Sequence, residues 1–194
     1  MKYFYCLLLV FTLAGCQTNL SNLPAYTETK QLQAVIETPA GAGYQNKYNP
    51  ETGEFLKVQE AGQDKVIRFL PWPVNVGFIP STRQPKATGS KDQPLPVLII
   101  AGSQEPGTVT EIMPLGVLIL ETAGEINYQL IATPAKPSER LINATSYDEF
   151  AKENVAIKKI LETWFINYAP AENTKIMAWK DDRFADELIR KWMK

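Results

Sequence analysis

Short apolar runs, separated by proline, glycine and polar residues, characterise the chain from residue 32 to residue 134. Most of these runs are rich in β-branched residues, which is typical of strands. The predicted strands cover residues 33–38, 55–58, 66–70, 97–101, 108–112, 116–120 and 129–133. Residues 49–53, with the sequence NPETG, predict a turn, whereas residues 80–96 predict a long loop because they have no apolar face.

Helical periodicity begins only after residue 145. Ser146 and Glu149 form a capping box, in which the serine accepts from a backbone N–H and the glutamate reaches back. The helix that follows has a predicted apolar face of Ile157, Ile160, Leu161, Trp164, Phe165 and Tyr168. A second helix is predicted to begin near Asp181, with Phe184, Leu188 and Trp192 on one face. Strands followed by helices predict an α+β fold.

The first sixteen residues, MKYFYCLLLVFTLAGC, have the pattern of a secretory signal that is too short to span a membrane. Residues 13–16, LAGC, resemble a bacterial lipobox, which implies cleavage before Cys16 and acylation of that cysteine. Because several acyl chains anchor a protein stably, we expect the lipid bilayer to be a partner. Gln17 favours an outer-membrane location facing the periplasm, and the alternative is a soluble secreted protein. The expected organisation is a signal peptide at 1–15, a tether at 16–31 and one domain at 32–194.

Composition narrows the possible chemistry. The chain has 20 Lys and Arg against 21 Asp and Glu, so no basic surplus indicates nucleic-acid binding. Histidine is absent, which removes the commonest general base and the commonest transition-metal ligand. Any catalysis must therefore use carboxylates, lysine, arginine, tyrosine or a hard metal ion held by oxygen atoms. Cys6 would leave with the signal, so no disulfide is expected.

Nine short segments occur in the same order, with similar gaps, as in one known family. They are AVIETP (34–39), NKYNPETG (46–53), PVNVGFIPST (73–82), PVLII (96–100), EPGTV (105–109), PLGVL (114–118), LIATP (130–134), WFINY (164–168) and AW (178–179). In this succession the chain resembles the family I soluble inorganic pyrophosphatases. The resemblance implies an OB-like five-stranded β-barrel with flanking helices. It also implies diphosphate hydrolysis with Mg²⁺ ions held by carboxylates, while Lys, Arg and Tyr bind the phosphates.

The chain departs from this family at the metal-binding positions. The family signature D-x-D-P-x-D-V-L aligns with residues 91–98, where Lys91, Gln93 and Pro96 replace the three aspartates. By the resemblance, the residual ligand-binding candidates are Glu37, Lys47, Tyr48 and Tyr168. Each of these also suits a purely structural role, as a strand-end carboxylate, a solvated lysine or a half-buried tyrosine.

These replacements predict an envelope lipoprotein that has lost Mg²⁺-dependent hydrolysis and acts as a binding or scaffold protein, with no cofactor and no catalytic residue. One alternative is an active inorganic diphosphatase with an altered Mg²⁺ site that uses Glu37, Asp92, Glu121 and Glu125. Another is a metal-free site in which Lys47, Lys91 and tyrosines hold a phosphate-bearing or sugar ligand. Either carboxylates converge in the barrel mouth, or Trp72, Val76 and Pro96 fill it. A homo-oligomer is also possible.

Overall fold

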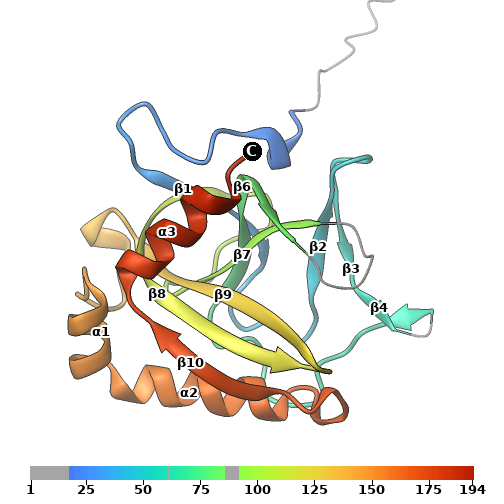
Figure 1. Ribbon diagram of the computed structural model, residues 1–194. Coiled ribbons are helices and arrows are strands. Elements are labelled where there is room, and N and C mark those ends of the chain that lie inside the picture. Colours follow the sequence, from blue (N-terminus) through green and yellow to red (C-terminus); the bar gives the residue numbers. More distant parts are fainter. Residues whose placement is uncertain (1–17, 61, 86–91) are drawn as a thin grey trace, which may run out of the picture.

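A ring of strands forms the centre of the computed structural model, which describes residues 18–60, 62–85 and 92–194 (Figure 1). The main sheet has six strands in the order β1-β6-β7-β9-β8-β10, and a β1–β8 pairing closes five of them into a barrel. Their bounds are β1 Leu32–Thr38, β6 Asn75–Gln84, β7 Gln93–Ile99, β8 Val109–Thr122, β9 Glu125–Pro134 and β10 Lys175–Lys180. All pairs are antiparallel except β7–β9. The predicted OB-like α+β barrel is confirmed.

Strand β8 closes the barrel because one of its edges serves two partners. Residues 109–112 pair with β1 and residues 117–121 pair with β10, while the other edge pairs with β9. The sequence predicted two strands here, at 108–112 and 116–120. The structure has one strand, since Pro114 and Gly116 produce a register shift in the ladder instead of ending it.

The predicted loop at residues 80–96 is wrong over much of its length. Residues 80–84 continue β6 and residues 93–96 begin β7, so that Gln84 pairs with Gln93 across the ladder. Residues 66–70 are not a strand, and Val66 makes only a single bridge to Tyr44. The polar sequence of 80–96 concealed these strand ends because both extend beyond the apolar part of the sheet.

Four short strands lie outside the main sheet. They are β2 Asn46–Asn49, β3 Glu54–Lys57, β4 Gln59–Glu60 and β5 Gln63–Asp64, and they pair as β2–β3 and β4–β5. The predicted turn at 49–53 joins β2 to β3, and Gly53 closes it with a φ of 72° and an N–H donated to the Asn49 carbonyl. A positive φ favours glycine at this position.

Three α-helices and three short 3₁₀ helices complete the described chain. They are α1 Tyr147–Glu153, α2 Val155–Asn167, α3 Asp182–Trp192, η1 Leu20–Asn22, η2 Pro137–Glu139 and η3 Pro170–Glu172. Ser146 caps α1 as predicted, accepting from the N–H of Glu149, whose carboxylate reaches back to Thr145. The apolar face predicted for α2 is wrong at Ile160, which is 53% exposed because the buried face is narrower.

Alternating side chains divide the core into two clusters on the two faces of the barrel wall. Val97 and Leu130 point into the barrel, where Ile189 of α3 also packs. Leu98 and Ile131 point outward, against α1 and α2. This period of two, expected for strands, gives each sheet face its own apolar layer.

Residues 18–31 contact the domain in the structure. Ala25 is buried, and its carbonyl accepts from the N–H of Gln33. The N–H of Leu20 donates to the hydroxyl of Tyr48. The division into a tether and a domain stays a prediction, and the proposed signal and Cys16 lie outside the described residues. In the described part of the chain, no helix is both long and apolar enough to cross a membrane.

Candidate functional site

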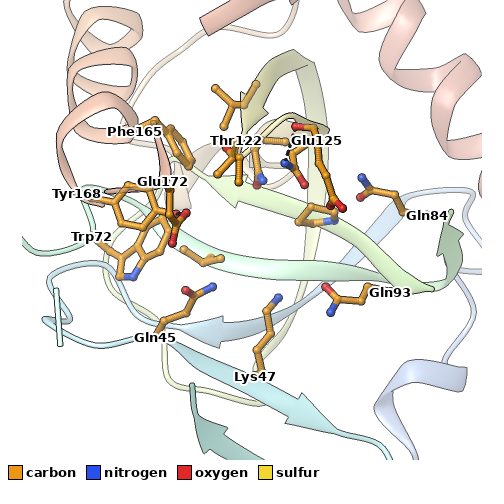
Figure 2. Close-up of a pocket in the computed structure, with 16 residues that line it drawn as sticks. Gln45, Lys47, Trp72, Gln84, Gln93, Thr122, Glu125, Phe165, Tyr168 and Glu172 are labelled. Atoms are coloured by element: carbon orange, nitrogen blue, oxygen red, sulfur yellow. Dashed lines mark hydrogen bonds between the residues drawn. The ribbon is translucent and has the colours of Figure 1, made fainter. Parts of the chain in front are cut away.

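A pocket of about 420 Å³ lies beside the barrel, and polar side chains from the five strands β2, β6, β7, β8 and β9 and from the end of α2 surround it (Figure 2). Its carboxamides come from Gln45, Gln84, Gln93, Asn127 and Gln129. The β6–β7 ladder brings two of these together, and alternation along β9 puts two others on one face with Glu125. The pocket therefore contains many groups that both donate and accept hydrogen bonds.

Among the described residues that line this pocket, Lys47 is the cation. It lies on β2 and its Nζ points into the cavity (Figure 2). The same Nζ lies 2.9 Å from Oε2 of Glu37, which is only 3% exposed and also accepts from the N–H of Tyr48 at 2.9 Å. A buried carboxylate with two donors thus orients the ammonium group, which is suited to bind a phosphate oxygen.

The two candidate tyrosines have different surroundings. Tyr48 packs between Phe55 and Phe78, away from the pocket. Tyr168 lines the pocket, stacks on Trp164 and donates its hydroxyl to Oε2 of Glu172 at 3.3 Å. Burial, together with the carboxylate of Glu172, raises the pKa of Tyr168, so this hydroxyl keeps its proton well above neutral pH.

Of the three replaced positions, Gln93 and Pro96 line the pocket, and Lys91 lies outside the described residues. Trp72 and Val76 are buried and also line it. The apolar residues that the sequence suggested thus line one part of this pocket, and carboxamides line the rest of it, which we call the amide-lined pocket.

The four carboxylates considered for an altered metal site do not converge. Glu37 pairs with Lys47, and Glu121 pairs with Lys175 at 3.0 Å. Asp92 lies 3.5 Å from Nε of Arg83. Only Glu125 lines the pocket, where its carboxylate points inward (Figure 2).

The donors present do not fit a cluster of carboxylate-held Mg²⁺ ions. Within residues 18–60, 62–85 and 92–194, no three His, Cys, Asp or Glu side chains are grouped so that they could hold a metal ion. Glu172 is the second carboxylate of the pocket, and Nζ of Lys65 lies 2.7 Å from it. The ammonium of Lys47 would repel a cation in the same cavity.

Several pocket residues were not anticipated from the sequence. Gln45 and Gln84 belong to no motif that the resemblance emphasises, and Gln84 lies within the segment predicted to be a loop. Glu172 ends η3, four residues after Tyr168 at the end of α2, and its carboxylate accepts from the Tyr168 hydroxyl because the chain turns between the two helices.

The structure is that of an OB-like α+β barrel protein with a small polar pocket beside the barrel wall. The sequence profile of the inorganic pyrophosphatase family matches residues 34–194. The chain belongs to this family. It is 30% identical to an inorganic pyrophosphatase of Mesorhizobium japonicum over 169 residues, which cover 82% of this chain and 86% of that protein.

Two further relatives agree. An inorganic pyrophosphatase of Agrobacterium fabrum is 29% identical over 167 residues, covering 81% of this chain and 85% of that protein. The crystal structure of the inorganic pyrophosphatase from Thermus thermophilus superposes with a TM-score of 0.73 at 27% identity, covering 89% of this chain and 95% of the other. The similarity in sequence and in structure therefore spans nearly the whole domain.

These relatives correct the predicted function. The prediction that the chain has lost diphosphate hydrolysis and serves as a binding or scaffold protein is wrong, because relatives similar over most of both chains are named inorganic pyrophosphatases. That prediction gave most weight to residues 91–98, a small part of the matched length. The comparisons favour the alternative, an active enzyme with an altered site.

Proposed function

We propose that the chain is an inorganic diphosphatase, converting diphosphate and water to two phosphates in the amide-lined pocket. The observation that carries the proposal is the match to named inorganic pyrophosphatases, up to 30% identical, over more than four fifths of the chain. The pocket differs from the aspartate pattern that the resemblance implies. The proposed enzyme therefore works with an altered site.

The side chains of the pocket can take three roles. The ammonium of Lys47 binds a phosphate oxygen, held in place by Glu37 at 2.9 Å. The amide of Gln93, whose side chain points into the cavity, donates to a second phosphate oxygen (Figure 2). The carboxylate of Glu125 accepts the proton of the attacking water, as a general base must lie in reach of that proton.

Phosphate release from inorganic diphosphate tests this proposal, with Mg²⁺, Mn²⁺ or Zn²⁺ added in turn and in a sample freed of metal by chelation. The metal series is included because the chain belongs to the inorganic pyrophosphatase family, for which the resemblance implies Mg²⁺, whereas the sequence led us to expect no cofactor. We expect turnover by the wild-type chain. Failure of the folded chain to release phosphate in every one of these conditions would overturn the proposal.

Two substitutions and two matched controls locate the activity. Glu125→Gln should lower kcat by about 10²-fold or more, since it removes the proposed base. Lys47→Met should mainly raise KM. Glu121→Gln and Lys175→Met make the same chemical changes in an ion pair outside the pocket and should behave as wild type. Equal losses in the controls would move the activity away from this pocket.

We also infer that the chain is anchored in the cell envelope through acylated Cys16, on the outer membrane facing the periplasm. The support is the sequence of residues 13–16 after an apolar run, and all of these residues lie outside the described part of the structure. Cys16→Ser should abolish incorporation of labelled fatty acid and move the protein from the membrane fraction to the soluble fraction. A wild-type chain that takes up no label would contradict the anchor.

A further inference from the structure

Residues 18–31 are held against the barrel from the point where the described chain begins. The side-chain amide of Asn19 donates to the carbonyl of Pro50 at 3.1 Å. The N–H of Leu20 donates to the hydroxyl of Tyr48 at 3.0 Å. This segment therefore follows a fixed path over the domain and adds little free length between the domain and the residues that precede it.

The proposed lipid attachment lies only two residues before this segment. Two extended residues span at most about 7 Å, so the chain cannot separate Cys16 from Thr18 by more than this distance. Acyl chains on Cys16 would hold the cysteine at the surface of the bilayer. The part of the domain around η1 would then lie at that surface too.

η1 lies on the same side of the molecule as the end of α3 (Figure 1). Ser81 of β6 connects them, since its hydroxyl donates to the Leu23 carbonyl at 2.7 Å and its carbonyl accepts from the N–H of Lys194 at 2.9 Å. Thr82 makes a further bridge to Met193. We call this surface, formed by η1, the end of β6 and the end of α3, the η1 face.

The η1 face carries a hollow with basic side chains. Arg83, Lys191 and Lys194 line this hollow, which has a volume of about 540 Å³. All three side chains are exposed. Asp92 lies 3.5 Å from Nε of Arg83, but an ion pair so open to solvent is weak and leaves the guanidinium able to bind a second anion. Arginine and lysine side chains together suit the phosphate of a lipid headgroup.

We propose that the η1 face lies against the bilayer and that its basic hollow binds the phosphates of anionic lipid headgroups. The proposal rests on the anchor at Cys16 inferred above, and it adds the orientation in which that anchor holds the domain. At physiological ionic strength charges interact over about 8 Å, and the two-residue link keeps the headgroups near this range. α1 and α2 lie on the other side of the molecule and face away from the membrane (Figure 1).

Footprinting with an amine reagent tests the orientation. The chain of residues 16–194 is coupled through the Cys16 thiol to a maleimide phospholipid in vesicles of phosphatidylethanolamine and phosphatidylglycerol. Mass spectrometry compares the acetylation rate of each lysine with that of the uncoupled chain. We expect Lys191 and Lys194 to react at least about fivefold more slowly on the vesicles. Lys152 of α1 and Lys159 of α2, both exposed, are the controls and should react at unchanged rates.

Two results would overturn the orientation. One is an equal change of rate at all four lysines. The other is slower acetylation on α1 and α2 while the lysines of the η1 face react as they do in solution. Either result would mean that the two-residue link does not hold the η1 face at the bilayer.

Lipid composition and substitution test the contact with anionic headgroups. On vesicles of phosphatidylcholine alone, or at high salt, we expect the protection of Lys194 to fall by about half or more. The double variant Arg83→Gln, Lys191→Gln should lose a similar share of this protection on the anionic vesicles. Lys152→Gln, Lys159→Gln makes a matched loss of two charges on the other side and should keep it. The same protection on both lipids and in both variants would overturn the role of the basic hollow.

The chemical coupling separates this inference from the proposed anchor. Because the phospholipid is attached in the test tube, the footprint does not depend on whether cells acylate Cys16. Uptake of fatty acid in cells without protection of Lys191 and Lys194 would overturn the orientation and leave the anchor standing. Protection of the coupled chain without uptake of fatty acid would overturn the anchor and leave the affinity of the η1 face for anionic lipid standing.

Discussion

At the scale of single residues, the position of the pocket's cation depends on a buried charge. Glu37 is 3% exposed and accepts from the ammonium of Lys47 and from the N–H of Tyr48. Removing one donor leaves a buried carboxylate that is only partly satisfied, which costs more than the pair itself contributes. Lys47 therefore has a structural role as well as a place in the pocket.

Lys47→Met should lower the free energy of unfolding by about 1–3 kcal/mol, at the lower end because the lysine side chain is 40% exposed. Lys175→Met removes a surface partner of Glu121 and should cost less than about 1 kcal/mol. Urea unfolding curves at neutral pH measure both values. Equal losses of unfolding free energy in the two variants would contradict the expectation that a buried carboxylate makes the removal of its lysine partner more costly.

Tyr168 gives the fold a defined response to alkali. Burial and the carboxylate of Glu172 raise its pKa in the folded chain, whereas in the unfolded chain it titrates near pH 10. Below about pH 10 the folded and the unfolded chain both keep the proton of Tyr168, so this group makes the free energy of unfolding no more and no less dependent on pH. Above it the unfolded chain releases a proton that the folded chain keeps, and stability falls by up to about 1.4 kcal/mol per pH unit.

Tyr168→Phe should remove this fall. The difference in unfolding free energy between wild type and variant, measured from about pH 8 to about pH 11, isolates the one group because the other tyrosines cancel. We expect a constant difference up to about pH 10 and then a decline of wild type relative to the variant. A difference that is flat throughout would mean that Tyr168 titrates normally.

At the scale of elements, the barrel depends on close approach between β1 and β6. A Cβ atom added to Gly77 would overlap with the carbonyl oxygen of Val35 on the neighbouring strand. Because that oxygen belongs to the backbone, no side-chain rotation can relieve the overlap. The two strands would have to separate.

Gly77→Ala should therefore lower the free energy of unfolding by at least about 2 kcal/mol. Gly102→Ala is the matched control, since an added Cβ there meets no atom within 4 Å. Thermal unfolding of the two variants measures the contrast. A Gly77→Ala protein as stable as the control would contradict the close packing of β1 on β6.

At the scale of the whole molecule, the two apolar clusters share the same barrel wall. Ile189 of α3 packs inside the barrel with Leu130, and Leu161 of α2 packs outside it with Ile131. Leu130 and Ile131 are adjacent on β9, so neither cluster can be lost while the other keeps its strand. The domain should unfold in one cooperative transition.

Ile189→Ala and Leu161→Ala should each lower the stability of that single transition by about 2–5 kcal/mol. Leu141→Ala, at a side chain that is 67% exposed, makes the same kind of truncation and should cost less than about 0.5 kcal/mol. Calorimetry and circular dichroism report the transition. Two separate transitions in either core variant would show that the clusters unfold independently.

The parts of the fold that local chemistry controls were predictable. The cap at Ser146, the turn at 49–53 and the buried face of α3 depend on residues close in the sequence. The ends of β6 and β7 were missed because their polar residues give no apolar alternation. Ile160 was misplaced because helical spacing indicates a face but does not determine how much of it is covered.

The sequence by itself determined the α+β order, the helix caps and, through nine ordered segments, membership in a family of barrel enzymes, because short-range propensity and spacing encode these features. Only the tertiary structure decided the site. Lys47, Gln84 and Glu125 come from three separate strands, and closure of the barrel brings them to one cavity. It also brings Glu37 and Glu121 to lysines and places Glu125 on the wall of the cavity. Contacts between distant segments, which no local pattern records, determine the chemistry of this pocket.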